Sequence, residues 1–188
     1  MKLERKRFFL CLAALVVALF MGIIVGYAVP FPEDAFPRQD VLGASTVMQD
    51  VRNVRTFRMI FFNNTRVFLL MAVGILTGGL VSLGEAFVIG YMVGVFSKIA
   101  TAQSMPVPIL LAALAPHGLF ELASFMTVGA LGLYFASRIY QSVKGQVIDW
   151  TQEVILYAKV AAACYIVLFV AALIEVYVTP TILHHLIT

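Results

Sequence analysis

The stretch FFLCLAALVVALFMGIIVGYAV, residues 8–29, decides the class of fold. It contains no charged residue, and a helix needs about 20 apolar residues to cross a bilayer core about 30 Å thick. The basic residues Lys2, Arg5, Lys6 and Arg7 precede it, as in a signal peptide, but the apolar run is longer than the roughly 7 to 15 residues of a cleavable one. We interpret residues 8–29 as an uncleaved signal anchor and the first transmembrane span.

The composition of the whole chain agrees with a membrane protein. Hydrophobic residues make up 62% of the 188 positions and charged residues only 12%, and the mean hydropathy is +0.97. A soluble domain has about a quarter charged residues. The net charge of +3 forms no basic stripe beyond the N-terminus, so nucleic acid is not an expected partner. Cys11 and Cys164 lie inside apolar runs, where we expect them to be packing residues.

Four further apolar segments complete an all-α, polytopic transmembrane bundle that occupies residues 1–188 as one domain. The predicted spans are residues 8–29, 67–83, 86–100, 117–140 and 155–178. Gly84 and Glu85 are expected to form the turn between the second and third spans. Because the composition leaves so little polar sequence, the bilayer is the expected surroundings of almost the whole chain.

Two segments beside these spans have their own patterns. In residues 47–62, apolar residues recur at helical spacing opposite a face that includes Arg52, Arg55 and Arg58. This pattern predicts an amphipathic helix, either lying at the membrane interface or packed on its own bundle with a solvated charged face. Residues 107–115 are predicted to form a half-helix, of the re-entrant kind, because Pro116 removes a helical hydrogen bond and is expected to break the helix there.

Alternating spans bring a set of polar residues to one membrane leaflet. Its members are Asn63, Asn64, His117, Glu121 and Glu175, with Arg66 and Lys98 as candidate charge partners. Each ionisable group within a span costs about 2.5 to 3.5 kcal/mol even on the lenient insertion scale, so such a group is a candidate site. His117 and Glu121 are separated by four positions and therefore share one helix face.

Four hypotheses account for this polar cluster. It locks helix packing through internal pairs; it forms an ion or solute site beside the break at Pro116; it binds a divalent metal through His117, Glu121 and Glu175; or it supports metal-dependent hydrolysis at the membrane. No diagnostic metal-ligand spacing is present, so no cofactor is predicted, and a divalent metal stays an alternative.

Small residues indicate where helices approach closely. Gly22 with Gly26, Gly74 with Gly78, and Gly90 with Gly94 have GxxxG spacing, which lets helix backbones come together. Pro116 and Gly118 are further candidate packing positions. In the later spans we expect these faces to pack within the chain. The first span is the better candidate for contact with a partner or a second copy, and self-association stays open.

The sequence resembles the stage II sporulation protein M family of multipass membrane proteins over about residues 57–180. The resemblance rests on IFFNN at 60–64, the glycines of the second and third spans, PHGLFEL at 116–122 and AALIEVYVTP at 171–180. One departure is Ile89, which precedes Gly90 where the family pattern has asparagine. The pattern coincides with the polar cluster at Asn63, Asn64, His117, Glu121 and Glu175.

The resemblance implies a membrane scaffold. The sporulation member acts with peptidoglycan-degrading partners during engulfment, but similar proteins occur in bacteria and archaea that never sporulate. We therefore expect a non-enzymatic, multi-pass protein of the cell membrane that organises a complex of membrane or cell-envelope proteins, with an ion or small-solute pathway as the second interpretation. The N-terminal basic cluster predicts a cytoplasmic N-terminus.

Overall fold

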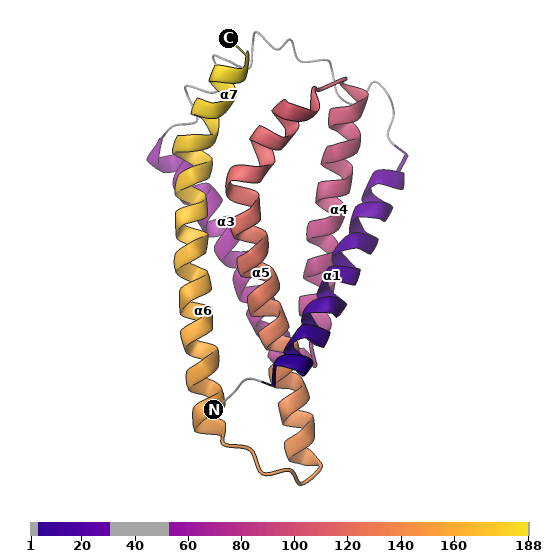
Figure 1. Cartoon of the computed structure of the whole chain (residues 1–188), viewed down its shortest axis with the longest axis vertical. Coiled ribbons are helices and arrows are strands. Elements are labelled where there is room, and N and C mark those ends of the chain that lie inside the picture. The colour runs from indigo at the N-terminus through magenta and orange to yellow at the C-terminus, as the bar shows by residue number, and fades with distance from the viewer. Residues whose placement is uncertain (1–3, 31–52, 188) are drawn as a thin grey trace.

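The computed structural model describes residues 4–30 and 53–187, and their helices form an all-α bundle (Figure 1). Within these described residues, five helical segments are long and apolar enough to cross a membrane. The described elements are α1 (Arg5–Ala28), α3 (Val54–Val73), the 3₁₀ turn η1 (Gly74–Thr77), α4 (Leu80–Ala102), α5 (Val107–Val143), α6 (Trp150–Leu173), the π-helical η2 (Ile174–Val178) and α7 (Thr179–Ile187). The fifth membrane-spanning segment runs through α6, η2 and α7 without interruption.

Helices α1 and α4 pack along most of their length through glycines. Gly22 and Gly26 of α1 face Gly90 and Gly94 of α4, and a Cβ atom at any of the four would overlap a backbone atom of the opposite helix. Two helix backbones can approach this closely only where side chains are absent. The expectation that the first span keeps its GxxxG face for a partner is therefore wrong, because that face is buried within the chain.

The second span ends earlier than the apolar pattern predicts. Gly78 and Gly79 have φ values of +65° and +93°, a left-handed conformation that glycine adopts at little cost. They form the turn into α4, which begins at Leu80. The predicted turn at Gly84 and Glu85 lies instead inside α4. Both residue pairs interrupt a hydrophobic run, and the paired glycines are the ones able to reverse the chain. Gly78, expected at a helix-packing face, is thus a turn residue.

The arginine-rich segment before the second span is not a separate interfacial helix. Helix α3 begins at Val54, capped by Asn53, whose side chain accepts a 2.8 Å hydrogen bond from the Thr56 amide, and it runs on into the span. Its Phe57 and Phe61 rings pack edge-on against Phe169 of α6, with centroids 5.5 and 5.4 Å apart. The apolar face thus packs on its own bundle, the second of the two alternatives. Residues 47–52 of the predicted amphipathic helix lie outside the described residues.

Pro116 does not break its helix. Residues 107–115 and the fourth span form one continuous helix, α5, with Pro116 inside it, which corrects the prediction of a half-helix. Figure 1 shows that this helix bends along its upper part, as expected where proline removes a hydrogen bond and crowds the preceding turn. A bend keeps all other backbone groups bonded within the helix, which a break inside the membrane would not.

A second proline reshapes the last span. Pro180 has no amide hydrogen and its ring crowds the carbonyl four residues before it. The backbone widens there into η2, and the Thr179 amide bonds the carbonyl of Ile174 five residues back. Such π-helical turns are frequent at functional sites. Glu175 lies within this turn.

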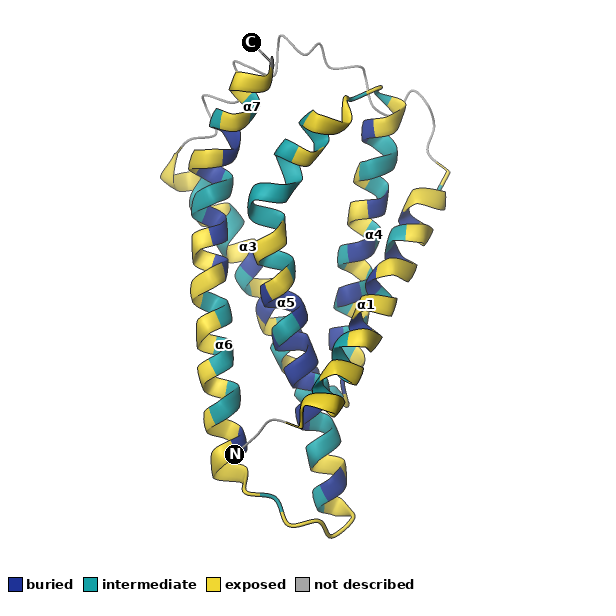
Figure 2. Ribbon diagram, viewed as in Figure 1, coloured by how far each residue is buried: buried dark blue, intermediate teal, exposed yellow. Residues whose placement is uncertain are grey.

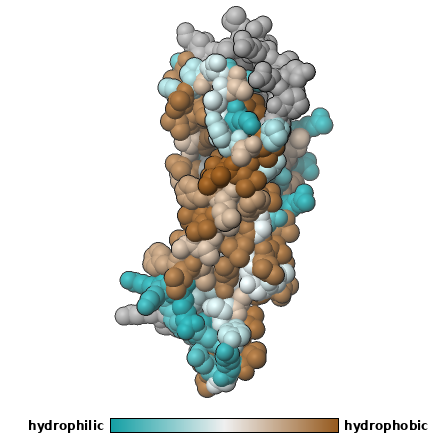
Figure 3. Space-filling model, turned by 90° about the vertical axis from the view of Figure 1, so that its right-hand side faces the viewer, coloured by the Kyte–Doolittle hydropathy of each residue, from teal (hydrophilic) through white to brown (hydrophobic). Residues whose placement is uncertain are grey.

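The buried core lies toward the end of the bundle that holds the start of α1. Its apolar residues include Leu15, Phe68, Met71, Val128 and Leu168. Figure 2 shows that buried positions are dense in the lower half of α5, whereas the upper part of the helix is only partly buried. The outer surface is mostly apolar, and Figure 3 shows a hydrophobic belt with hydrophilic residues gathered mainly below it. This distribution suits a bundle surrounded by lipid.

Candidate functional site

The polar residues of the upper half of the bundle meet at the contact between α3 and α5. The Asn64 side chain, only 7% exposed, donates a hydrogen bond from Nδ2 to the carboxylate Oε1 of Glu121. Asn64 follows Ile60 by one helical turn, on the side of α3 that faces the bundle. Because a carboxylate in an apolar setting is costly without a donor, this hydrogen bond compensates part of the cost of placing Glu121 there.

A second contact joins α5 to the last span. Nδ1 of His117, one turn before Glu121 on α5, lies 3.3 Å from the hydroxyl Oγ1 of Thr179, which is buried at the junction of η2 and α7. Glu175, in the widened turn η2, is half-buried and near enough to Glu121 to interact with it electrostatically. The structure therefore brings together Asn64, His117, Glu121 and Glu175, and adds Thr179. We call these five residues the polar seam.

Three residues expected in this cluster lie elsewhere. Asn63 and Arg66 are exposed on the outer side of α3. The ammonium of Lys98 donates a hydrogen bond to the backbone carbonyl of Val29, so it ties the end of α4 to the end of α1. Within the described part of the chain, neither glutamate of the polar seam forms an ion pair. The Asn64 amide bonds the Glu121 carboxylate, and Glu175 rather than a predicted cation lies near it.

The geometry also bears on the metal hypothesis. Among residues 4–30 and 53–187, no three His, Cys, Asp or Glu side chains converge as ligands of one metal ion would. His117, Glu121 and Glu175, the candidate ligands, are included in that search. His117 is directed instead toward the hydroxyl of Thr179, and Glu121 toward the amide of Asn64.

The candidate packing residues have different surroundings. A Cβ at Gly74 would overlap the hydroxyl of Ser82 on α4, and the same hydroxyl donates a 2.9 Å hydrogen bond to the Met71 carbonyl. Gly74 therefore allows the close contact of the hairpin formed by α3 and α4. Gly118, in contrast, has open space where a Cβ would be.

Sequence reasoning missed a charged network at the opposite end of the bundle. Arg138 of α5 donates from Nε to Glu153 of α6 at 3.0 Å, and from one guanidinium nitrogen to Glu4 and Gln141, each at 2.7 Å. Glu153 is 1% exposed, and its second oxygen has no hydrogen-bond partner among residues 4–30 and 53–187. Arg138 and Glu153 lie near the facing ends of consecutive helices joined by a short loop, which was the available signal.

These features define an integral membrane protein of the α-helical, multi-pass class. Its five apolar helices have lengths suited to a bilayer, and its in-membrane polar groups bond to one another across helix contacts. Residues 10–180 match the family described as Stage II sporulation protein M, so the chain belongs to that family.

The chain is also similar to an archaeal protein. An uncharacterized protein of the archaeon Methanocaldococcus jannaschii is 28% identical over 134 residues, which cover 70% of this chain and 75% of the relative. No solved structure matches this chain.

Proposed function

We propose that the protein is a non-enzymatic membrane scaffold that organises a complex of membrane or cell-envelope proteins, a second copy of the chain being one candidate member. The observation that carries the proposal is the use of the in-membrane polar groups in contacts between helices. Asn64 bonds Glu121, and His117 bonds Thr179. Polar groups used in this way fix the arrangement of the helices, which is the requirement for presenting a defined surface to partners.

The surface available to such partners is apolar. Large hydrophobic side chains are exposed along the outer faces of α1, α4 and α6, among them Phe20, Met92 and Ile166. Lipid covers such faces in an isolated protein, and another transmembrane helix can replace the lipid. The described residues outside the helices are few, so partner recognition is expected mainly within the membrane.

Crosslinking within the membrane tests this proposal. A photoreactive amino acid is placed at Ile166, which is 65% exposed on α6, and a matched one at Val147 in the loop before α6. A scaffold should give a discrete protein adduct from Ile166, and Glu121→Gln should weaken that adduct while the purified protein stays folded. Recovery of lipid adducts alone, with no protein adduct from any of the outer faces, would count against a scaffold.

An ion or solute pathway is the second candidate, favoured by one observation. Glu121 and Glu175 approach each other beside the π-helical turn η2, where the regular helix is interrupted. Irregular helices with paired acidic residues occur along transport pathways. The test is pH- or ion-dependent flux into liposomes, with Glu121→Gln and Glu175→Gln beside the wild type. Elemental analysis of the same preparations would test for a bound divalent metal.

A further inference from the structure

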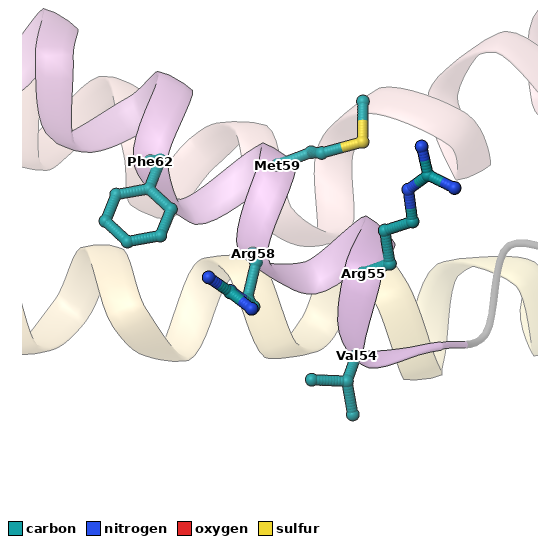
Figure 4. Close-up of a pocket in the computed structure, with 5 residues that line it drawn as sticks. All are labelled: Val54, Arg55, Arg58, Met59 and Phe62. Atoms are coloured by element: carbon teal, nitrogen blue, oxygen red, sulfur yellow. The ribbon is translucent and has the colours of Figure 1, made fainter.

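A surface on the outer side of α3 combines exposed arginines with exposed apolar side chains. A pocket in this surface is lined by Val54, Arg55, Arg58, Met59 and Phe62, all from the first turns of the helix (Figure 4). Val54, Met59 and Phe62 are each more than 60% exposed. The aromatic contacts of α3 with α6 use Phe57 and Phe61, so the pocket surface adjoins the helix-packing face but does not form these contacts.

The charged and apolar side chains of this surface are arranged in the same order as the headgroup and acyl chains of a phospholipid. Arg55 precedes Met59, and Arg58 precedes Phe62, each by one helical turn, and Figure 4 shows the two pairs on either side of the helix. Helix α3 enters the membrane from this end, so each arginine lies nearer the headgroups and each apolar side chain lies deeper. Arg55 and Arg58 are three positions apart, so their long side chains can both reach one phosphate, whose acyl chains would then lie against Met59 and Phe62.

The two arginines can offer their hydrogen-bond donors to a ligand. Neither Arg55 nor Arg58 forms an ion pair with a carboxylate among the described residues. A guanidinium presents five N–H donors in a planar fork that suits phosphate oxygens, and it is the preferred group for such contacts. Positive charge on an exposed surface at the headgroup level attracts anionic lipids.

We propose that this surface is a binding site for one anionic glycerophospholipid, with its phosphate held by Arg55 and Arg58 and a chain lying along Met59 and Phe62. The bilayer leaflet in question is the one at the start of α3, opposite the basic N-terminal cluster. The site is separate from the polar seam, so the proposal stands independently of the scaffold function.

Tryptophan quenching by brominated lipids tests the site. Trp150, the single tryptophan, begins α6 at the opposite end of the bundle. A reporter variant carries Trp150→Phe and Phe62→Trp, and the wild-type Trp150 serves as the reporter for a distant surface. Both are reconstituted in phosphatidylcholine vesicles with increasing fractions of brominated phosphatidylglycerol.

Quenching of the reporter at position 62 should rise more steeply than the fraction of brominated lipid. Quenching of Trp150 should rise only in proportion to that fraction. Adding Arg55→Gln and Arg58→Gln should lower the apparent preference for phosphatidylglycerol about fivefold for each arginine removed. Arg5→Gln with Lys6→Gln, which removes the same charge from the start of α1, should leave it unchanged. Equal, unselective quenching with and without the arginines would overturn the proposal and leave the surface to a protein partner or to bulk lipid.

Discussion

Asn64 of α3 donates a hydrogen bond to Glu121 of α5, a residue 57 positions later in the chain. The two helices also meet through the core lower in the bundle, where Phe68 and Val128 are buried. In the upper half, burial is lower and the polar contact replaces apolar packing as the link between them. Its strength should therefore be measurable as a coupling between the two residues.

A double-mutant cycle with Asn64→Ala and Glu121→Ala should give a coupling free energy of about 0.6 to 1.7 kcal/mol, the range for hydrogen bonds between transmembrane helices. Each single variant loses the contact, and the double variant loses little more. The measurement is the free energy of unfolding in mixed micelles. Asn63→Ala is the control, because Asn63 is exposed and should show no coupling to Glu121. Strict additivity of the Asn64 and Glu121 variants would show that the bond contributes nothing to stability.

The sequence predicted that Asn64 and Glu121 lie in one polar cluster, and the reason is physical. Polar residues within apolar spans are conspicuous, and alternating spans place them in one leaflet. The same logic placed Lys98 and Arg66 in the cluster, but it has no information on which side of a helix faces the bundle. Arg66 and Asn64 are two positions apart, so they point to different sides of α3. The sequence could predict which polar residues lie toward the same end of the bundle, but it could not predict which of them contact one another.

Helix ends were predicted less well than helix number. A hydrophobicity window finds a run that can cross the membrane, but it does not distinguish a glycine pair that turns the chain, Gly78 and Gly79, from glycines inside a helix. Pro116 and Pro180 give a bend and a π-helical turn, respectively, rather than an end. In a membrane, neighbouring backbone groups must remain bonded, which favours distortion of a helix over its interruption.

The charged network around Arg138 predicts that the free energy of unfolding depends strongly on this central residue. Arg138→Met would leave the 1% exposed carboxylate of Glu153 without its cation, and breaking a buried pair costs about 3 to 5 kcal/mol. The double variant Arg138→Met, Glu153→Leu should recover most of this loss, because it removes the unpaired charge. Unfolding free energies of the three proteins provide the comparison.

Arg7→Gln gives the comparison for an exposed pair at the edge of the same network, because its partner Glu4 also bonds Arg138. Arg7 pairs with Glu4 at an exposed site, and exposed pairs contribute about 0 to 1 kcal/mol. If Arg138→Met were as mild as Arg7→Gln, the network would be solvated in the membrane-bound protein, and Glu153 would not be the buried charge that the geometry indicates.

The glycine contact between α1 and α4 predicts sensitivity to a single methyl group. Gly26→Ala would place its Cβ against the Tyr91 carbonyl, so the helices must separate, at about 1 to 3 kcal/mol. Disulfide crosslinking between cysteines introduced on α1 and α4 should fall in parallel with stability. Gly84→Ala is the control, since its Cβ meets no atom within 4 Å, and alanine should stabilise that helical position by about 0.5 to 1 kcal/mol. Equal effects of the two substitutions would contradict close packing at Gly26.

The distribution of basic residues predicts the orientation of the bundle in the membrane. Four of the described spans precede the loop before α6, which places it on the same side as the N-terminus, and three precede the loop between α4 and α5, which places that loop on the other side. Basic residues flank the first of these sides, with Arg5 and Lys6 at the start of α1 and Lys144 after α5. Since basic residues near the first span usually remain in the cytoplasm, we predict a cytoplasmic N-terminus.

Cysteine labelling separates the two orientations. In a background of Cys11→Ser and Cys164→Ser, Ser104→Cys should react with a membrane-impermeant maleimide in intact cells. Gln146→Cys, in the loop before α6, should react only after the membrane is permeabilised. The reverse pattern would place the arginines of α3 in the cytoplasm. In that case the positive charge of Arg55 and Arg58, rather than that of the N-terminal cluster, would have determined the insertion of the chain.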